Sequence, residues 1–209
     1  MVKKIAYLIC IFLIIACQNE QQQLESARAE AEKIHEEGLI KLQAGNMEEA
    51  LALFNEAIEI DETFEQPHVN KVEVYLNTSE YEKAIKEIDL IIEKSPETAE
   101  NWVLAGIFKE KQGDKKTAFE YYEKSIVKFQ DRIDQKEESN NEDDFENSTM
   151  DDEIGILFSY ILLEDFERLD DAMISFENKN PDSPLIESLL EFNKEVYMEN
   201  IFPDYEPAE

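Results

Sequence analysis

The chain has two histidines, His35 and His68, and imidazole is the commonest protein ligand for transition metals. They lie at nearly the same phase of two adjacent 34-residue segments, so a shared metal ion is conceivable. Histidines on a surface or in a groove are far more common than such pairs. We therefore expect no metal site, and the sequence calls for no cofactor.

The acidic cluster at residues 142–153 is the second candidate for chemistry, because carboxylates bind calcium. It lacks the alternating Asp/Asn ladder and the glycine of a calcium loop, so we interpret it as a solvated run of charge. The sequence contains no Ser-His-Asp order, no glycine-rich phosphate loop and no metalloprotease motif. We expect no catalytic residues and no enzyme.

The first residues form a targeting segment and are set apart from the fold. Lys3 and Lys4 are followed by the apolar run Ile5–Ile15, which is too short for a membrane span of about 20 residues. The run ends in Ile-Ile-Ala before Cys17, and polar residues follow at once. This pattern indicates a signal peptide.

The same ending resembles the lipobox of bacterial lipoproteins, in which an aliphatic and a small residue precede a cysteine. The resemblance implies that residues 1–16 are removed and that lipid is attached to Cys17. Gln18 stands where an aspartate would retain such a protein at the inner membrane, so the family's sorting rule implies the outer membrane, facing the periplasm. The alternative is an ordinary secretory signal with an incidental cysteine. With Cys10 removed and Cys17 lipidated, no thiol remains for catalysis or metal binding.

The charge of the chain restricts its partners. Loss of the two lysines in residues 1–16 changes the net charge from −30 to −32. Phosphates would be repelled, so we expect no nucleic acid partner. A protein or peptide partner with basic residues would gain in association rate.

Three segments of equal length, 31–64, 65–98 and 99–132, repeat one pattern without a gap. Small residues, large apolar residues and isoleucines recur at a spacing of 34 residues, a period typical of stacked supersecondary units. The recurring sets are Ala50, Ala84 and Ala118; Gly38, Val72 and Gly106; Phe54, Ile88 and Tyr122; and Ile58, Ile92 and Ile126.

This pattern resembles the tetratricopeptide repeat, a helix–turn–helix unit. The resemblance implies an all-α fold, an α-solenoid of three tandem hairpins over residues 25–133. Gly45 and Gly113 suit the positive φ at the end of each first helix, and Asn46 and Asp114 suit the start of the second. Val72 departs from the pattern, because a small residue is usual there.

The remaining segments flank the repeats. We predict a lipidated tether at 17–24, an acidic loop at 134–152, and a degenerate fourth hairpin with a capping helix at 153–199. In that hairpin, Ala172 and Phe176 repeat the spacing of Ala50 and Phe54. One amphipathic helix is expected from Leu185 to Met198, and residues 200–209 are expected to be a frayed tail.

The resemblance also implies a partner groove lined by the first helix of each unit. The groove residues combine aliphatic and acidic side chains, which suits an extended or helical peptide with apolar anchors and some basic residues. The subtype that grips a C-terminal carboxylate needs Lys, Asn and Arg there, and this sequence lacks that set. Alternatively, the fourth hairpin or the tail folds into the groove. The residues are Glu32, His35, Leu39, Leu42, Gln43, Gln66, Val69, Glu73, Leu76, Asn77, Glu100, Val103, Ile107, Glu110 and Lys111.

Together these features favour a noncatalytic scaffold, lipid-anchored in a bacterial envelope complex, that binds protein or peptide partners. The alternative is a transient chaperone or assembly factor for outer-membrane or pilus-type secretion components. Neither hypothesis involves a small-molecule substrate.

Overall fold

The structure is a computed structural model that describes residues 2–138, 145–181, 183–203 and 205, with side chains from residue 21 and, after the gap, from residue 149. These residues form ten α-helices and no strand. The chain divides into two compact units, Met1–Thr78 and Ser79–Glu209. Among the helices so described, none is both long enough and apolar enough to span a bilayer.

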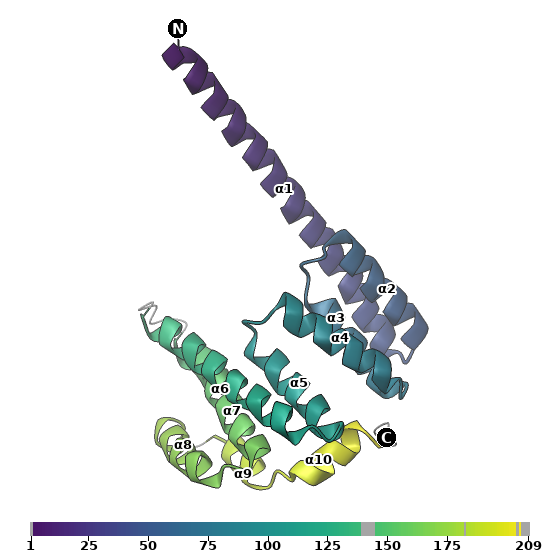
Figure 1. Cartoon of the computed structure of the whole chain (residues 1–209), viewed down its shortest axis with the longest axis vertical. Helices are drawn as coiled ribbons and strands as arrows, with labels where there is room; N and C mark the ends of the chain where they lie inside the picture. Colours follow the sequence, from purple (N-terminus) through teal and green to yellow (C-terminus); the bar gives the residue numbers. More distant parts are fainter. Residues whose placement is uncertain (1, 139–144, 182, 204, 206–209) are drawn as a thin grey trace. The chain divides into compact units, whose positions relative to one another are not determined.

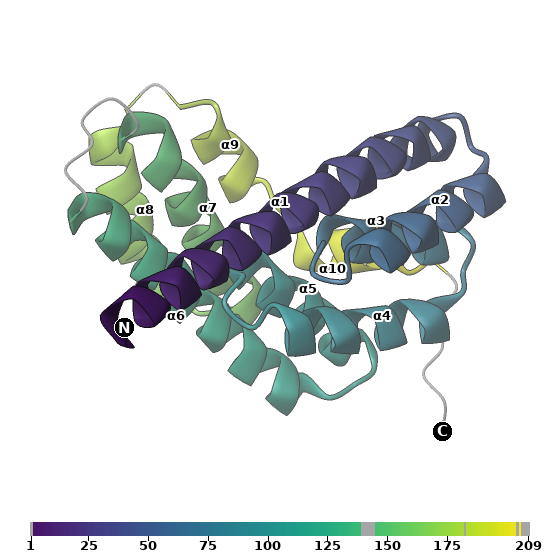
Figure 2. The same ribbon diagram turned by 90° about the horizontal axis from the view of Figure 1, so that it is seen from above.

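The first unit consists of three helices. In Figure 1 and Figure 2, α1 continues as one straight helix well beyond its contact with α2. The predicted signal peptide and tether are therefore helical in the structure, while the side chain of Cys17 lies outside the described ones. The bounds are α1 (Val2–Gln43), α2 (Met47–Ile60) and α3 (Gln66–Asn77).

The second unit contains the other seven helices. Its centre is a run of three packed helices, in which α5 contacts α6 and α6 contacts α7. Helix α4 precedes these three along the chain, and α8, α9 and α10 follow them. The bounds are α4 (Tyr81–Lys94), α5 (Ala99–Lys111), α6 (Lys115–Glu138), α7 (Phe145–Leu163), α8 (Phe166–Lys179), α9 (Leu185–Leu190) and α10 (Lys194–Ile201).

A glycine packed on an aromatic ring recurs where two helices meet closely. A Cβ added at Gly38 of α1 would lie 2.6 Å from Cε1 of Phe54 in α2. Gly106 of α5 has the same relation to Tyr122 of α6. Both rings are fully buried, so the small residues predicted from the repeat are explained by close approach of the paired helices.

The turns between the first and second helices share one backbone feature, a residue with positive φ. Gly45 and Gly113 have φ of 78° and 86°, as the sequence predicts. Ser79 and Glu164 adopt φ of 57° and 58° at the equivalent points, after α3 and α7. Glycine is therefore favoured at this turn but not required, at a cost of about 1 kcal/mol for another residue.

The turn at Glu164 corrects the register of the fourth hairpin. Ala50 and Phe54 follow Gly45 by five and nine residues, and the same count from Glu164 reaches Leu169 and Met173. The predicted alignment with Ala172 and Phe176 is wrong by three residues. These two residues copy a spacing of four that any helix face produces. Met173, Phe176 and Leu157 instead form one cluster, against which Ile186 and Leu189 of α9 pack.

Three predicted segment boundaries also change. Helix α6 runs to Glu138 and α7 starts at Phe145, so most of the predicted acidic loop is helical, while residues 139–144 lie outside the described part. The predicted helix Leu185–Met198 is two helices, because the Asn193 side chain accepts a hydrogen bond from Val196 N, at 3.0 Å, and starts α10. The expected frayed tail contains the buried Phe202, which is 2 % exposed.

Candidate partner-binding face

His35 is a structural residue of the first unit. Its imidazole is 8 % exposed and lies 5.6 Å from the ring of Phe54 and 5.1 Å from the ring of Phe64, between centroids. The Asn70 amide of α3 is 2.6 Å from its Nε2. Burial lowers the pKa of His35, so the ring is neutral at pH 7. His35 therefore connects α1 to α2 and α3, and its buried ring is not available to a partner.

The aliphatic groove residues predicted on the first helix pack into the core of the unit. Leu42 belongs to a core cluster with Phe54 and Val74, and Leu39 packs against that cluster. The predicted groove positions that keep surface in this unit are mainly polar. Glu32, Gln43, Gln66, Glu73 and Asn77 are exposed, and Val69 and Leu76 are partly buried.

In the second unit, the five predicted groove residues all belong to α5. Val103 and Ile107 are buried, and Glu100 forms a two-pronged ion pair with Arg132 of α6, at 2.6 and 3.3 Å. Of the five predicted groove residues in this unit, Glu110 and Lys111 remain as candidates for partner contact, and both lie near the end of α5.

Glu110 is the acidic centre of this face. One carboxylate oxygen lies 2.7 Å from the ammonium of Lys194 in α10, and the other accepts a hydrogen bond of 3.0 Å from the Tyr122 hydroxyl. Burial, with Glu110 as a second cause, raises the pKa of Tyr122, so its hydroxyl remains a donor. Lys194 also donates to the carbonyl of Leu162, at 2.6 Å, and to the Glu164 carboxylate, at 3.1 Å.

Phe202 covers the neighbouring position. Its ring stands edge-on to Phe108 of α5, with centroids 4.8 Å apart, and lies 6.0 Å from the ring of Tyr81. The ammonium of Lys111 lies 5.7 Å from the centre of the same ring. In Figure 1, α10 is correspondingly drawn beside the end of α5. We call Glu110, Lys111, Phe108 and Tyr81 the α5 face.

The α5 face is covered by residues 193–203 and 205, here called the C-terminal segment. Folding of the chain's own end onto the predicted groove was the alternative raised by the sequence, and for the second unit it is what the structure shows. Glu110 is thus brought together with Lys194 of α10, and Lys111 with Phe202, which directly follows α10. Sequence reasoning missed Lys194 and Phe202, although an aromatic residue just after an amphipathic stretch was a usable signal.

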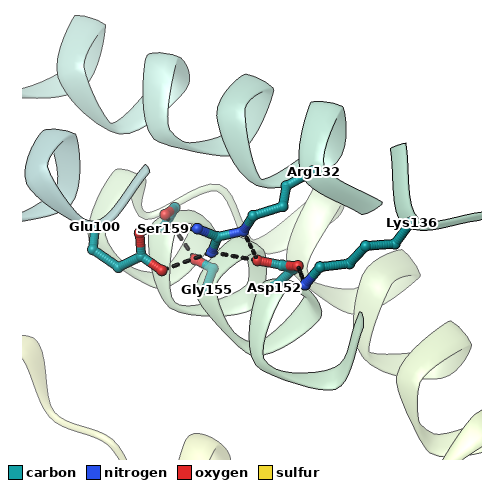
Figure 3. Close-up of polar contacts among 6 residues, drawn as sticks. All are labelled: Glu100, Arg132, Lys136, Asp152, Gly155 and Ser159. Atoms are coloured by element: carbon teal, nitrogen blue, oxygen red, sulfur yellow. Dashed lines mark hydrogen bonds and ion pairs between the residues drawn. The ribbon is translucent and has the colours of Figure 1, made fainter. Parts of the chain in front are cut away.

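The acidic cluster contains a third residue that sequence reasoning missed. Asp152 of α7 is 1 % exposed and lies between Arg132 and Lys136 of α6, as Figure 3 shows. The Arg132 Nε and the Lys136 ammonium donate to its two oxygens, at 2.5 and 2.7 Å. It is therefore an interhelical ion pair rather than a solvated charge. Two cations four residues apart on one helix were the signal for it.

The structure offers no evident chemistry at these carboxylates. Asp152 is paired with two cations, and Glu110 with a cation and a phenol hydroxyl, so the oxygens of both carboxylates are engaged within the fold. Within the part of the chain that the structure describes, no three His, Cys, Asp or Glu side chains form a group that could hold a metal ion.

Comparisons with known proteins agree with the helical hairpins. Family models of the tetratricopeptide repeat match residues 41–105 and 99–126. The structure is similar to pilF of Pseudomonas aeruginosa, with a TM-score of 0.52 and 16 % identity over 89 % of this chain and 79 % of that one. No curated protein sequence matches the chain.

Two other solved structures are similar at a lower level. The Sgt2 domain from Aspergillus fumigatus has 22 % identity and a TM-score of 0.44, covering 66 % of this chain and 82 % of that one. YrrB has 15 % identity and a TM-score of 0.41, covering 76 % and 91 %. The fold confirms the expected all-α class of helical hairpins, and the family models recognise tetratricopeptide repeats within residues 41–126.

Proposed function

We propose that this chain is a noncatalytic scaffold that binds protein or peptide partners and is held by lipid on Cys17 at a bacterial outer membrane. The observation that supports the binding role is the contact of the C-terminal segment with the α5 face, through Lys194 with Glu110 and Phe202 with Phe108. This surface holds a short helix by an ion pair and the residue after it by an aromatic contact, so it offers one charged and one apolar anchor to a peptide. The tetratricopeptide repeats of residues 41–126 are consistent with such a role.

Partner binding is tested by crosslinking from defined positions in native membranes. A photoreactive side chain replaces Lys111, at the α5 face, or Asp131, an exposed residue in the second half of α6. The scaffold hypothesis predicts that one envelope protein is crosslinked from position 111 and not from position 131. Equal adducts from both positions would contradict it.

The lipid anchor rests on the sequence Ile-Ile-Ala-Cys at residues 14–17. Two or three acyl chains on Cys17 would give stable attachment, whereas a single chain holds a protein only marginally. The wild-type chain should partition into detergent, and Cys17→Ala should move to the aqueous phase. Cys10→Ala is the matched control and should behave as wild type. A detergent-phase Cys17→Ala chain would contradict lipidation at this residue.

A transient assembly factor is the second candidate, and the ion pair at the α5 face favours it. Contacts between charged groups speed association and weaken as salt rises. If captured partners exchange within seconds and are lost between low and physiological salt, the transient role is supported. Salt-resistant capture over hours supports the permanent scaffold.

A further inference from the structure

We propose that the C-terminal segment is an internal ligand of the α5 face, and that a partner helix with a lysine and an aromatic residue eight positions later displaces it. This inference rests on the proposed function and specifies the partner. The spacing is that of Lys194 and Phe202. Lys194 is the first residue of α10, and Phe202 follows the last helical residue with a non-helical φ of −128° and ψ of 61°. The partner therefore needs a helix of about two turns that begins at the lysine and is followed directly by the aromatic residue.

The first anchor site is built for an ammonium group. The Lys194 side chain is 13 % exposed, and its ammonium has three acceptors within reach. They are Glu110 of α5, at 2.7 Å, the Leu162 carbonyl of α7, at 2.6 Å, and Glu164, at 3.1 Å. Three acceptors match the three donors of a lysine, so this site selects for that residue in a competing helix.

The second anchor site is aromatic. The Phe202 ring is 2 % exposed and contacts the rings of Phe108, Tyr81 and Tyr205. Lys111 lies over the same ring, at 5.7 Å, which favours an aromatic occupant over an aliphatic one.

The internal ligand fits this surface incompletely. The Tyr81 hydroxyl is buried and has no hydrogen-bond partner among the described residues. A buried donor without an acceptor is unfavourable, so a competing helix that presents a carbonyl or carboxylate here would gain over the internal one. This is the contact at which a partner can bind more tightly than the chain's own segment.

The internal ligand is also weakly attached. Helix α10 has eight residues and none of them is fully buried. A helix of this length does not persist in water without its contacts. Its exposed positions include Glu195 and Glu199, which add negative charge to a chain of net charge −30. A partner with lysines at those two positions would be attracted more strongly.

The test is binding of a fluorescent peptide with the sequence of residues 193–205 to the full chain in detergent, measured by anisotropy. Phe202→Ala weakens the internal ligand and leaves the α5 face intact, so this variant should bind the peptide at least tenfold more tightly than wild type. Adding Glu110→Gln should reverse the gain. Val196→Ala, at an exposed residue of the same helix, should match wild type. A peptide with lysines at positions 195 and 199 should bind more tightly at low salt.

The inference is overturned if Phe202→Ala and wild type bind the peptide equally, or not at all, while circular dichroism shows both folded. Lys194→Gln provides a second opening variant and must give the same direction of change. These outcomes are separable from the proposed function. Crosslinks from position 111 without peptide exchange would support the scaffold function and refute the internal ligand. Peptide exchange without an envelope crosslink would support the internal ligand and refute the scaffold function.

Discussion

Helices α7 and α10 both contact the hairpin that α5 and α6 form in the second unit, but the contacts differ in kind. Gly155 of α7 lies directly on the ring of Phe129 in α6, and the Ser125 and Ser159 hydroxyls of the two helices are 2.9 Å apart in a fully buried position. Asp152 adds a buried ion pair. Helix α10 is held by Lys194, while Phe202 follows at its end.

The comparison indicates how one hairpin supports both a permanent and an exchangeable contact. The α7 contact places the Ser125 and Ser159 hydroxyls and the Asp152 carboxylate where water does not reach, so separation of the helices would break hydrogen bonds of buried groups. The α10 contact has two anchors at the edge of the unit, and each can be replaced by the same side chain from another helix. A contact of the second kind suits partner exchange.

The largest difference is expected between two phenylalanines. Phe129→Ala opens a cavity under Gly155 and should lower the free energy of unfolding by about 3–5 kcal/mol. Phe202 is equally buried, at 2 % exposed against 3 %, but release of the C-terminal segment limits its loss. We expect about 1–2 kcal/mol for Phe202→Ala, below the usual range for a core aromatic. Urea unfolding followed by Trp102 fluorescence measures both, and equal losses would refute the distinction.

A smaller effect is expected at the buried aspartate. Asp152→Ala leaves Arg132 and Lys136 without their shared carboxylate, and both cations are about one third exposed. Water can therefore solvate them in part, so we expect a loss of about 2–3 kcal/mol rather than the 3–5 of a fully buried pair. Asp151→Ala, at the exposed neighbouring residue, should change unfolding by less than about 0.5 kcal/mol. Similar effects of the two substitutions would contradict the ion-pair assignment.

The lysine of α10 should matter less again. Lys194→Ala should cost about 1 kcal/mol, because the segment can detach and let water reach Glu110. Lys128→Ala removes an ion pair with the exposed Glu97 and should have almost no effect. The two variants are compared by chemical unfolding in low salt. A loss at Lys194 as large as that at Asp152 would place α10 among the permanent contacts.

The smallest effect is expected in the first unit, where the stability should depend on pH through His35. Burial holds the pKa of His35 below its ordinary value of 6.5, so the unfolded chain binds a proton that the folded one does not. The stability of the first unit should therefore be complete above pH 7 and decline as the pH falls through 6.5. His35→Gln should remove this dependence. The protection factors of the α2 amides at pH 7.5 and 5.5 measure this stability. If the protection still declines at low pH in the variant, another group causes the pH dependence.

The repeats could be predicted from the sequence because their signals are local and periodic. Close packing requires Gly38 and Gly106, and positive φ favours the glycines of two turns. The turns at Ser79 and Glu164 carry no such residue, and the register of the fourth hairpin was consequently assigned wrongly.

The occupied face was harder to predict, because it depends on contacts between distant segments. Family positions placed Glu110 and Lys111 in a groove, but they do not show that Lys194, 84 residues after Glu110, reaches that groove. Composition likewise assigned Asp152 to solvent, since its cations lie on another helix. In each case the missing information was tertiary pairing of charges.

Native-state hydrogen exchange tests the central distinction between the two contacts most directly. The amides of Tyr197 and Phe202, which donate to Asn193 and Met198, should exchange through a local opening that is insensitive to low urea. The amides of α7 around Gly155 should exchange at least about tenfold more slowly and only with unfolding of the unit. If α10 and α7 instead exchange at the same rate and with the same urea dependence, the C-terminal segment is a permanent part of the core and not a replaceable ligand.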